Sequence, residues 1–112
     1  MRYLVIFLFF CFFGGQSVFA STVSSTKIKS ILVGEVYGNK VFIEITVKPS
    51  VEPSCQTNSD YSYIFDPTTE VGKITMSMLL TAYASGRDVY LNGYDTCTIY
   101  DGVENLRQIW IQ

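Results

Sequence analysis

The chain has 112 residues, of which 48% are hydrophobic, with 8 basic residues, 10 acidic residues and no histidine. Its formal net charge of −2 excludes the basic surface that nucleic-acid-binding domains need, so no nucleic-acid partner is expected. The lack of histidine also excludes a serine or cysteine nucleophile that an imidazole base would activate.

The N-terminal segment has the pattern of a secretory signal peptide. Arg2 precedes the apolar run at 4–13, and the small-residue motif VFA follows and ends at Ala20. The apolar run is too short to span a bilayer comfortably, so no membrane insertion is expected. The pattern predicts a cleaved signal peptide, 1–20, and one exported domain, 21–112, that is secreted or periplasmic. Loss of Arg2 changes the formal net charge from −2 to −3.

The first half of the exported domain is rich in strand patterns. Residues 21–27 are polar and are expected to be loose. Alternating apolar and polar side chains at 28–37 and 40–48 predict two strands, and Gly38-Asn39 between them is a signal for a tight hairpin. An irregular loop and a short strand are expected next, at 49–60 and 61–65.

One α-helix is expected at about 68–85. The side chains of 66–70 (DPTTE) can cap its free N–H groups, and Gly86 can end it. Strands are expected after the helix at 88–94, 96–100 and 106–112, with a turn at Asp101-Gly102.

This order of elements predicts a β-rich α+β fold. The helix lies between predicted strands three and four, as in a small OB-type Greek-key β-barrel with one central helix. A plain α+β sandwich is a less specific alternative.

The predicted helix has two apolar sides, which is unusual on a small exported domain. At 100° per residue, one side carries Val71, Ile74, Thr75, Met78 and Ala82, and the other carries Met76, Leu80, Tyr83 and Ala84. One side is expected to lie on the sheet. The other is covered either by the 49–60 loop or by neighbouring subunits, and the second alternative makes Met76, Leu80 and Tyr83 candidates for an oligomer interface.

Cys55 and Cys97 are the two cysteines of the expected exported domain. An isolated pair in an exported chain predicts a disulfide, which would stabilise the fold by about 4 kcal/mol. A redox or metal-binding pair is the alternative, but the chain has no Cys-x-x-Cys motif and no histidine. No metal and no cofactor are expected.

Catalysis is not expected from the acidic residues either. The pairs Asp66/Glu70 and Asp101/Glu104 lie at a helix start and at a turn, where capping accounts for them. The sequence therefore predicts a protein that is not an enzyme.

Tyrosines are frequent, and a tyrosine combines a flat apolar face with a polar tip. Tyr94 lies beside Asn92 and Asp95 in a predicted turn, and a ring, an amide and a carboxylate together could hold a glycan. These three residues are the glycan-binding candidates. Packing on a sheet remains an equal alternative for each tyrosine.

The run GKITMSMLLTAYASGRDVYLNGYDTC, followed by LRQIWIQ, resembles the B subunits of subtilase-cytotoxin-type AB5 toxins and their smaller secreted relatives. The shared features are an LL-x-A helix, a small-Gly stop, an apolar strand and a later cysteine, within about residues 61–111. The resemblance implies an OB barrel, a homopentameric ring with helices lining its centre, a glycan-binding outer surface and a catalytic A subunit as partner.

The chain also departs from that family. Its expected exported domain is shorter than the toxin subunits and has one expected disulfide where some relatives have more. The family has a sialic-acid-contacting tyrosine whose nearest candidate here is Tyr94, displaced by about one residue at the Asn92-Gly93 turn, and its first-strand serine has no matched position.

These features predict a bacterial, exported, non-catalytic subunit that forms a ring and recognises cell-surface glycans. The alternative is a monomeric exported OB-fold protein that binds a protein partner, as an inhibitor or an envelope-stress factor does.

Overall fold

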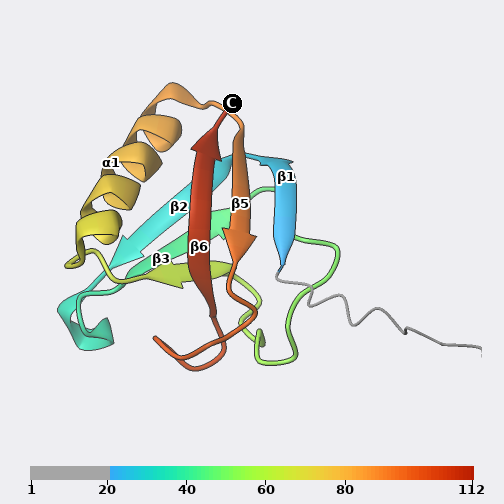
Figure 1. The fold of residues 1–112 in the computed structure, drawn as a ribbon, viewed down its shortest axis with the longest axis vertical. Helices are drawn as coiled ribbons and strands as arrows, with labels where there is room; N and C mark the ends of the chain where they lie inside the picture. Colours follow the sequence, from blue (N-terminus) through green and yellow to red (C-terminus); the bar gives the residue numbers. More distant parts are fainter. Residues whose placement is uncertain (1–20) are drawn as a thin grey trace, which may run out of the picture.

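The computed structural model describes residues 21–112, and the expected signal peptide, 1–20, lies outside this part of the chain. The elements are β1 (Thr22–Thr26), β2 (Ile28–Val33), the 3-10 helix η1 (Glu35–Tyr37), β3 (Val41–Ile45), β4 (Tyr63–Phe65), α1 (Glu70–Ser85), β5 (Val89–Gly93) and β6 (Glu104–Ile111). The α+β class and the helix are as predicted, and α1 lies between β4 and β5 because an unpredicted strand, β1, precedes the others (Figure 1).

The six strands form one mixed sheet in the order β1-β5-β6-β4-β3-β2. All neighbours are antiparallel except β4 and β6, which are parallel. The end strands β1 and β2 are separated only by Lys27, and in the described chain they pair with β5 and β3, not with each other. The prediction of a closed OB-type barrel is therefore wrong. The sheet stays open because β1 and β2 are its two end strands and no ladder joins them.

Strand β1 occupies residues that the sequence predicts to be loose. It pairs with β5 so that Val23 lies opposite Leu91, and Thr26 lies opposite Val89. Val23 and Thr26 are buried, whereas Thr22, Ser24 and Ser25 are exposed. The segment has only one aliphatic side chain to mark the buried face, while its Thr and Val residues favour extended backbone.

Two other predicted elements differ in the structure. The expected tight hairpin is a longer connection, 34–40, which includes η1, although Gly38 and Asn39 do turn the chain with positive φ angles of 71° and 59°. The expected strand at 96–100 is a loop with a single bridge between Tyr100 and Val103.

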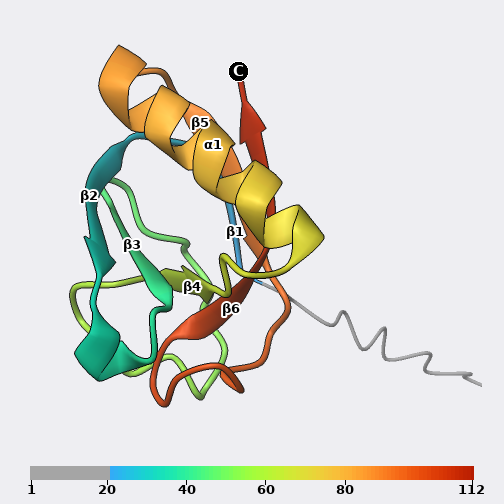
Figure 2. The ribbon, with the colours of Figure 1, turned by 90° about the vertical axis from the view of Figure 1, so that its left-hand side faces the viewer.

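Helix α1 covers the inner face of the sheet and packs against β2 and β6 (Figure 2). Thr69 caps its first turn by accepting a hydrogen bond from the Gly72 N–H at 2.9 Å, and Gly86 ends it in the left-handed conformation. The buried residues of α1 are Gly72, Leu79 and Ala82, with Met76 and Met78 partly buried on the same core. The buried side of the helix therefore differs from both predicted sides. Val71 and Ile74, which share one predicted side with buried Ala82, are 65% and 62% exposed.

A second cluster lies on β3 and β4 around Phe42, Ile64 and Val103, apart from the core beneath α1. The rings of Tyr37, Tyr61 and Tyr100 surround Phe42 edge-on, with centroid distances of 5.3, 5.5 and 5.0 Å. Three tyrosines are thus used for packing.

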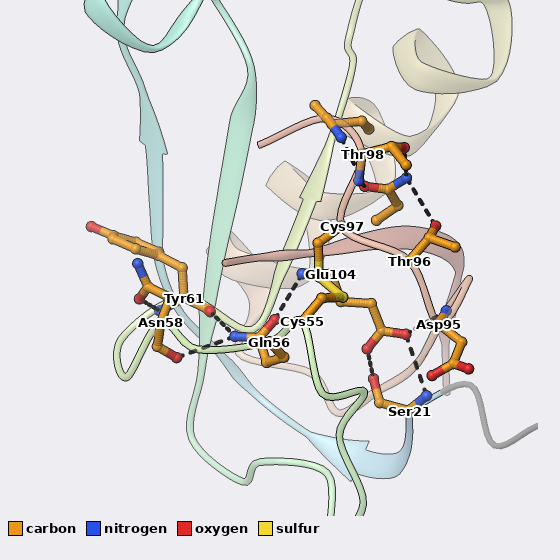
Figure 3. Close-up of a disulfide and its surroundings, with 12 residues drawn as sticks. Ser21, Cys55, Gln56, Asn58, Tyr61, Asp95, Thr96, Cys97, Thr98 and Glu104 are labelled. Atoms are coloured by element: carbon orange, nitrogen blue, oxygen red, sulfur yellow. Dashed lines mark hydrogen bonds between the residues drawn. A yellow bond between two sulfur atoms is a disulfide. The ribbon is translucent and has the colours of Figure 1, made fainter. Parts of the chain in front are cut away.

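The predicted disulfide between Cys55 and Cys97 is confirmed, with Cα atoms 5.9 Å apart (Figure 3). It joins the loop before β4 to the loop between β5 and β6. A disulfide of this kind indicates an oxidising, extracytoplasmic compartment.

We expect Gly72→Ala to destabilise the fold, although alanine is the better helix former by about 1 kcal/mol. A Cβ at Gly72 would collide with the backbone carbonyl oxygen of Asp66, so the start of α1 would have to shift. The free energy of unfolding should fall by about 1–3 kcal/mol in urea denaturation under oxidising conditions. Ser77→Ala, at an exposed position of α1, is the control and should change it by less than about 0.5 kcal/mol. Equal stability of the two variants would contradict this close contact.

Candidate binding site

A cavity of about 190 Å³ opens beside the first turns of α1. It is lined by Phe65, Asp66, Thr69, Val71, Gly72, Thr75, Tyr94, Ile99, Leu106 and Arg107. The end of β4, the start of α1, the 94–99 loop and β6 meet here. Each of these four segments therefore contributes residues to the cavity wall.

Asp66 lines the cavity, and its carboxylate already has hydrogen-bond and ion-pair partners within the fold. Its Oδ1 accepts hydrogen bonds from the Thr68 hydroxyl at 2.6 Å and the Thr68 N–H at 2.9 Å, and Lys40 Nζ lies 3.2 Å from Oδ2. The Thr68 hydroxyl above all, then the Thr68 N–H and Lys40, lower the pKa of Asp66 to about 2. The carboxylate is therefore ionised and neutralised by Lys40.

The opposite wall, 94–99, is held in place by Asn105 at the start of β6. The Asn105 amide donates to Thr98 Oγ1 at 2.6 Å and accepts from the N–H groups of Thr98 and Ile99, both at 3.2 Å. Its backbone carbonyl accepts from Tyr94 N at 2.9 Å. Together with the disulfide at Cys97, these bonds fix a loop that has no regular secondary structure.

Two groups on the cavity wall are left available for a ligand. Tyr94 is 58% exposed, and its hydroxyl has no hydrogen-bond partner among residues 21–112. The Arg107 guanidinium makes no hydrogen bond or ion pair in the same part of the chain. A free cation and an aromatic residue that line one cavity suit a small polar ligand that carries a negative charge.

The three predicted glycan-binding residues do not lie together. Of them only Tyr94 lines the cavity. Asn92 donates from Nδ2 to Thr22 Oγ1 at 2.8 Å, toward β1, and the Asp95 N–H donates to the carboxylate of Glu104 at 2.9 Å. Asp95 has a positive φ of 65°, and the backbone bends at this residue, directly after Tyr94.

The three residues predicted for an oligomer interface do not share one exposed surface. Leu80 and Tyr83 are half-exposed on α1, whereas Met76 packs against the core beneath the helix. Arg107 and Asn105 were not predicted as site residues. The one available signal was that Arg107 is the only charged side chain in the strand LRQIWIQ.

A further exposed aromatic residue lies outside the cavity. Trp110 on β6 pairs with Tyr90 on β5, with ring centroids 6.1 Å apart, and its side chain is exposed. Trp110 therefore offers a natural comparison for Tyr94 in binding experiments.

Among residues 21–112, no three His, Cys, Asp or Glu side chains are grouped so that they could hold a metal ion. In the same range, no helix is long and apolar enough to cross a membrane.

Comparison of the chain with protein-family models, with curated proteins and with solved structures gives no match. The resemblance to AB5 B subunits therefore rests on the residues quoted above, and the function has to be argued from the geometry of the site.

Proposed function

We propose that the protein is an exported, non-catalytic binding subunit that holds one acidic sugar residue of a cell-surface glycan in the cavity beside α1. The observation that carries this proposal is that an unpaired Arg107 guanidinium and an exposed Tyr94 ring line the same cavity of about 190 Å³. We assign export to the predicted signal peptide, and hence a secreted or periplasmic location.

The chemistry of the two groups fits a sugar that bears a carboxylate. A guanidinium binds a carboxylate through two parallel hydrogen bonds, and a tyrosine ring can cover the apolar face of a sugar ring. Sites for drug-sized ligands have volumes of about 300–1,000 Å³, and this cavity is smaller. It therefore takes one sugar residue and leaves the rest of the glycan outside.

Such a small contact implies weak binding at each site, which several linked sites would strengthen. Helix α1 supports self-association because apolar side chains are exposed on both sides of its buried face. Val71 and Ile74 lie on one side, and Leu80 and Tyr83 lie on the other. A closed ring needs two different surfaces on each subunit, one for each neighbour. We therefore propose a ring of copies of this chain, with a pentamer as the expected size from the resemblance.

The topology gives the proposal further support. A single helix between β4 and β5 and one parallel strand pair in an otherwise antiparallel sheet are compatible with a relative of the OB type whose sheet is left open between β1 and β2. A catalytic A subunit would be a further partner.

We expect Tyr94→Ala and Arg107→Gln each to weaken binding to sialylated or uronic-acid glycans on an array by about 10–100-fold. The estimate follows from the loss of a stacked ring in one variant and of a charge-assisted hydrogen bond in the other. Neutral glycans should lose affinity with Tyr94→Ala but not with Arg107→Gln.

Trp110→Ala is the matched control, because it removes an exposed aromatic ring outside the cavity. Binding lost with Trp110→Ala and kept with Tyr94→Ala would reject the cavity as the glycan site. Equal binding by all four proteins would reject glycan recognition through either aromatic residue.

We expect native mass spectrometry of the oxidised protein at micromolar concentration to give a mass near five subunits. Leu80→Glu should shift this mass to the monomer, since a charge would then be buried between α1 and its neighbour. Gln108→Glu adds the same charge on exposed β6 and should leave the oligomer intact. A monomeric wild-type protein would favour the alternative, an exported protein that binds a protein partner.

A further inference from the structure

Glu104, the first residue of β6, carries a fully buried carboxylate, with 0% of the residue exposed. Its side-chain partners are all hydrogen-bond donors. The N–H groups of Asp95 and Ser21 lie 2.9 and 3.3 Å from Oε2, and the Ser21 hydroxyl donates to Oε1 (Figure 3). A Cβ at Gly93 would collide with the same carboxylate. The pocket is therefore shaped around this group, and the donors favour its ionised form.

A buried ionised carboxylate is costly unless a positive charge lies beside it. The ion pairs of residues 21–112 are Lys27–Asp88, Lys29–Glu44 and Lys40–Asp66, and none of them includes Glu104. Burial raises the pKa of Glu104, and the hydrogen bonds from Ser21 and Asp95 oppose this rise. The chain therefore places an acid in its interior without a basic side chain to neutralise it.

Ser21 is fixed beside Glu104 by several hydrogen bonds, and only 1% of the residue is exposed. Its carbonyl oxygen accepts hydrogen bonds from the Gly93 N–H at 2.9 Å and the Tyr63 hydroxyl at 3.1 Å. Its own hydroxyl lies 3.0 Å from the Tyr63 hydroxyl. Ser21 is thus a fixed part of the fold, although it precedes the first strand.

We infer that Ser21 is the first residue of the mature protein and that its α-ammonium group forms a buried ion pair with Glu104. The VFA motif that ends at Ala20 directs cleavage to the bond before Ser21. Hydrolysis by a signal peptidase consumes one water: its oxygen bonds to the Ala20 carbonyl carbon, and the Ser21 nitrogen leaves as an amine that takes up protons. The positive charge then forms on the nitrogen that lies 3.3 Å from Glu104 Oε2.

Cleavage therefore supplies the charge that the interior lacks. In the precursor the Ser21 nitrogen is a neutral amide with one N–H, whereas in the mature chain it is a cation with three. A start one residue earlier or later would move the cation by about 3.8 Å along the chain and lose the pair. This inference does not depend on glycan binding.

The test compares four proteins in a two-by-two design. The mature domain begins either at Ser21 or with Gly-Ala before Ser21, and each form carries either Glu104 or the Glu104→Gln substitution. The extension should lower Tm by about 5–15 °C in the Glu104 form and by less than about 2 °C in the Glu104→Gln form. Glu35→Gln, at an exposed carboxylate, is the control and should leave the effect of the extension unchanged. Additive effects of the extension and of Glu104→Gln would overturn the ion pair.

Two measurements on the unaltered protein keep the test decisive if Glu104→Gln fails to fold. The intact mass of the product exported from the full-length chain should correspond to a start at Ser21, and any other start overturns the inference. The pKa of the Ser21 α-amino group, from NMR titration, should lie above its ordinary 7.7–8.0, and a value at or below about 8 overturns the pair.

The direction of the pH effect follows from the raised amine pKa. With Glu104 ionised, the ion pair should stabilise the fold fully below about pH 8 and be lost as the pH rises through the folded-state pKa of the amine. It should also be lost in acid, where Glu104 takes up a proton. The other titratable groups around the pair are Tyr63 on β4, Asp95 after β5 and, acting on Tyr63, Glu52 and Tyr90. None of them carries a positive charge, so none can take the place of the amine.

Discussion

The hydrogen bonds made by the first two residues of β6 hold the molecule together. Glu104 binds the chain at Ser21 and Asp95 through its side chain, and its N–H donates to Gln56 beside the disulfide at 2.7 Å. Asn105 holds the whole 94–99 loop. Three separate segments therefore take their positions from two adjacent polar residues in the middle of the sheet. The cavity wall that carries Tyr94 is one of them, so the candidate site depends on the same bonds as the fold.

The molecule divides its apolar side chains between two clusters with different origins. The core beneath α1 joins the helix to the inner face of the sheet, and its largest members are aliphatic. The cluster around Phe42 lies outside β3 and β4 and is closed by loops that the disulfide ties together. In a domain of this size the disulfide supplies part of the stability that a larger hydrophobic core would provide. The 49–60 loop binds Gly102 and Glu104 through Thr57, Asn58 and Gln56, while α1 keeps the apolar side chains of Val71, Ile74, Leu80 and Tyr83 exposed.

Much of the fold could be predicted from local signals in the sequence. The helix, its capping residues and the disulfide follow from residue types at known spacings, as Thr69, Gly86, Cys55 and Cys97 show. Strand β1 could not be found in this way, because Ser and Thr residues hide its alternation and only pairing with β5 makes it a strand. The open sheet was missed for a related reason: nothing local shows that the chain changes partners at Lys27.

The candidate site was harder to predict than the fold. Tyr94 was found because an aromatic residue beside a turn is commonly exposed, but its expected companions Asn92 and Asp95 do not line the cavity. Arg107 and Asp66 come to the cavity from distant parts of the chain, and Asp66 forms an ion pair with Lys40. Only the three-dimensional arrangement shows that Lys40 neutralises Asp66 and that Arg107 has no ion-pair partner among residues 21–112.

The position of β6 in the sheet has a consequence for folding. Strand β6 lies between β5 and β4, so it alone joins the β1-β5 pair to the β4-β3-β2 strands through strand pairing. Contacts between distant parts of a chain form late, because the intervening loop must be closed first. A chain without residues 104–111 therefore cannot complete its sheet. The six strands become one sheet only when this segment has paired on both of its sides.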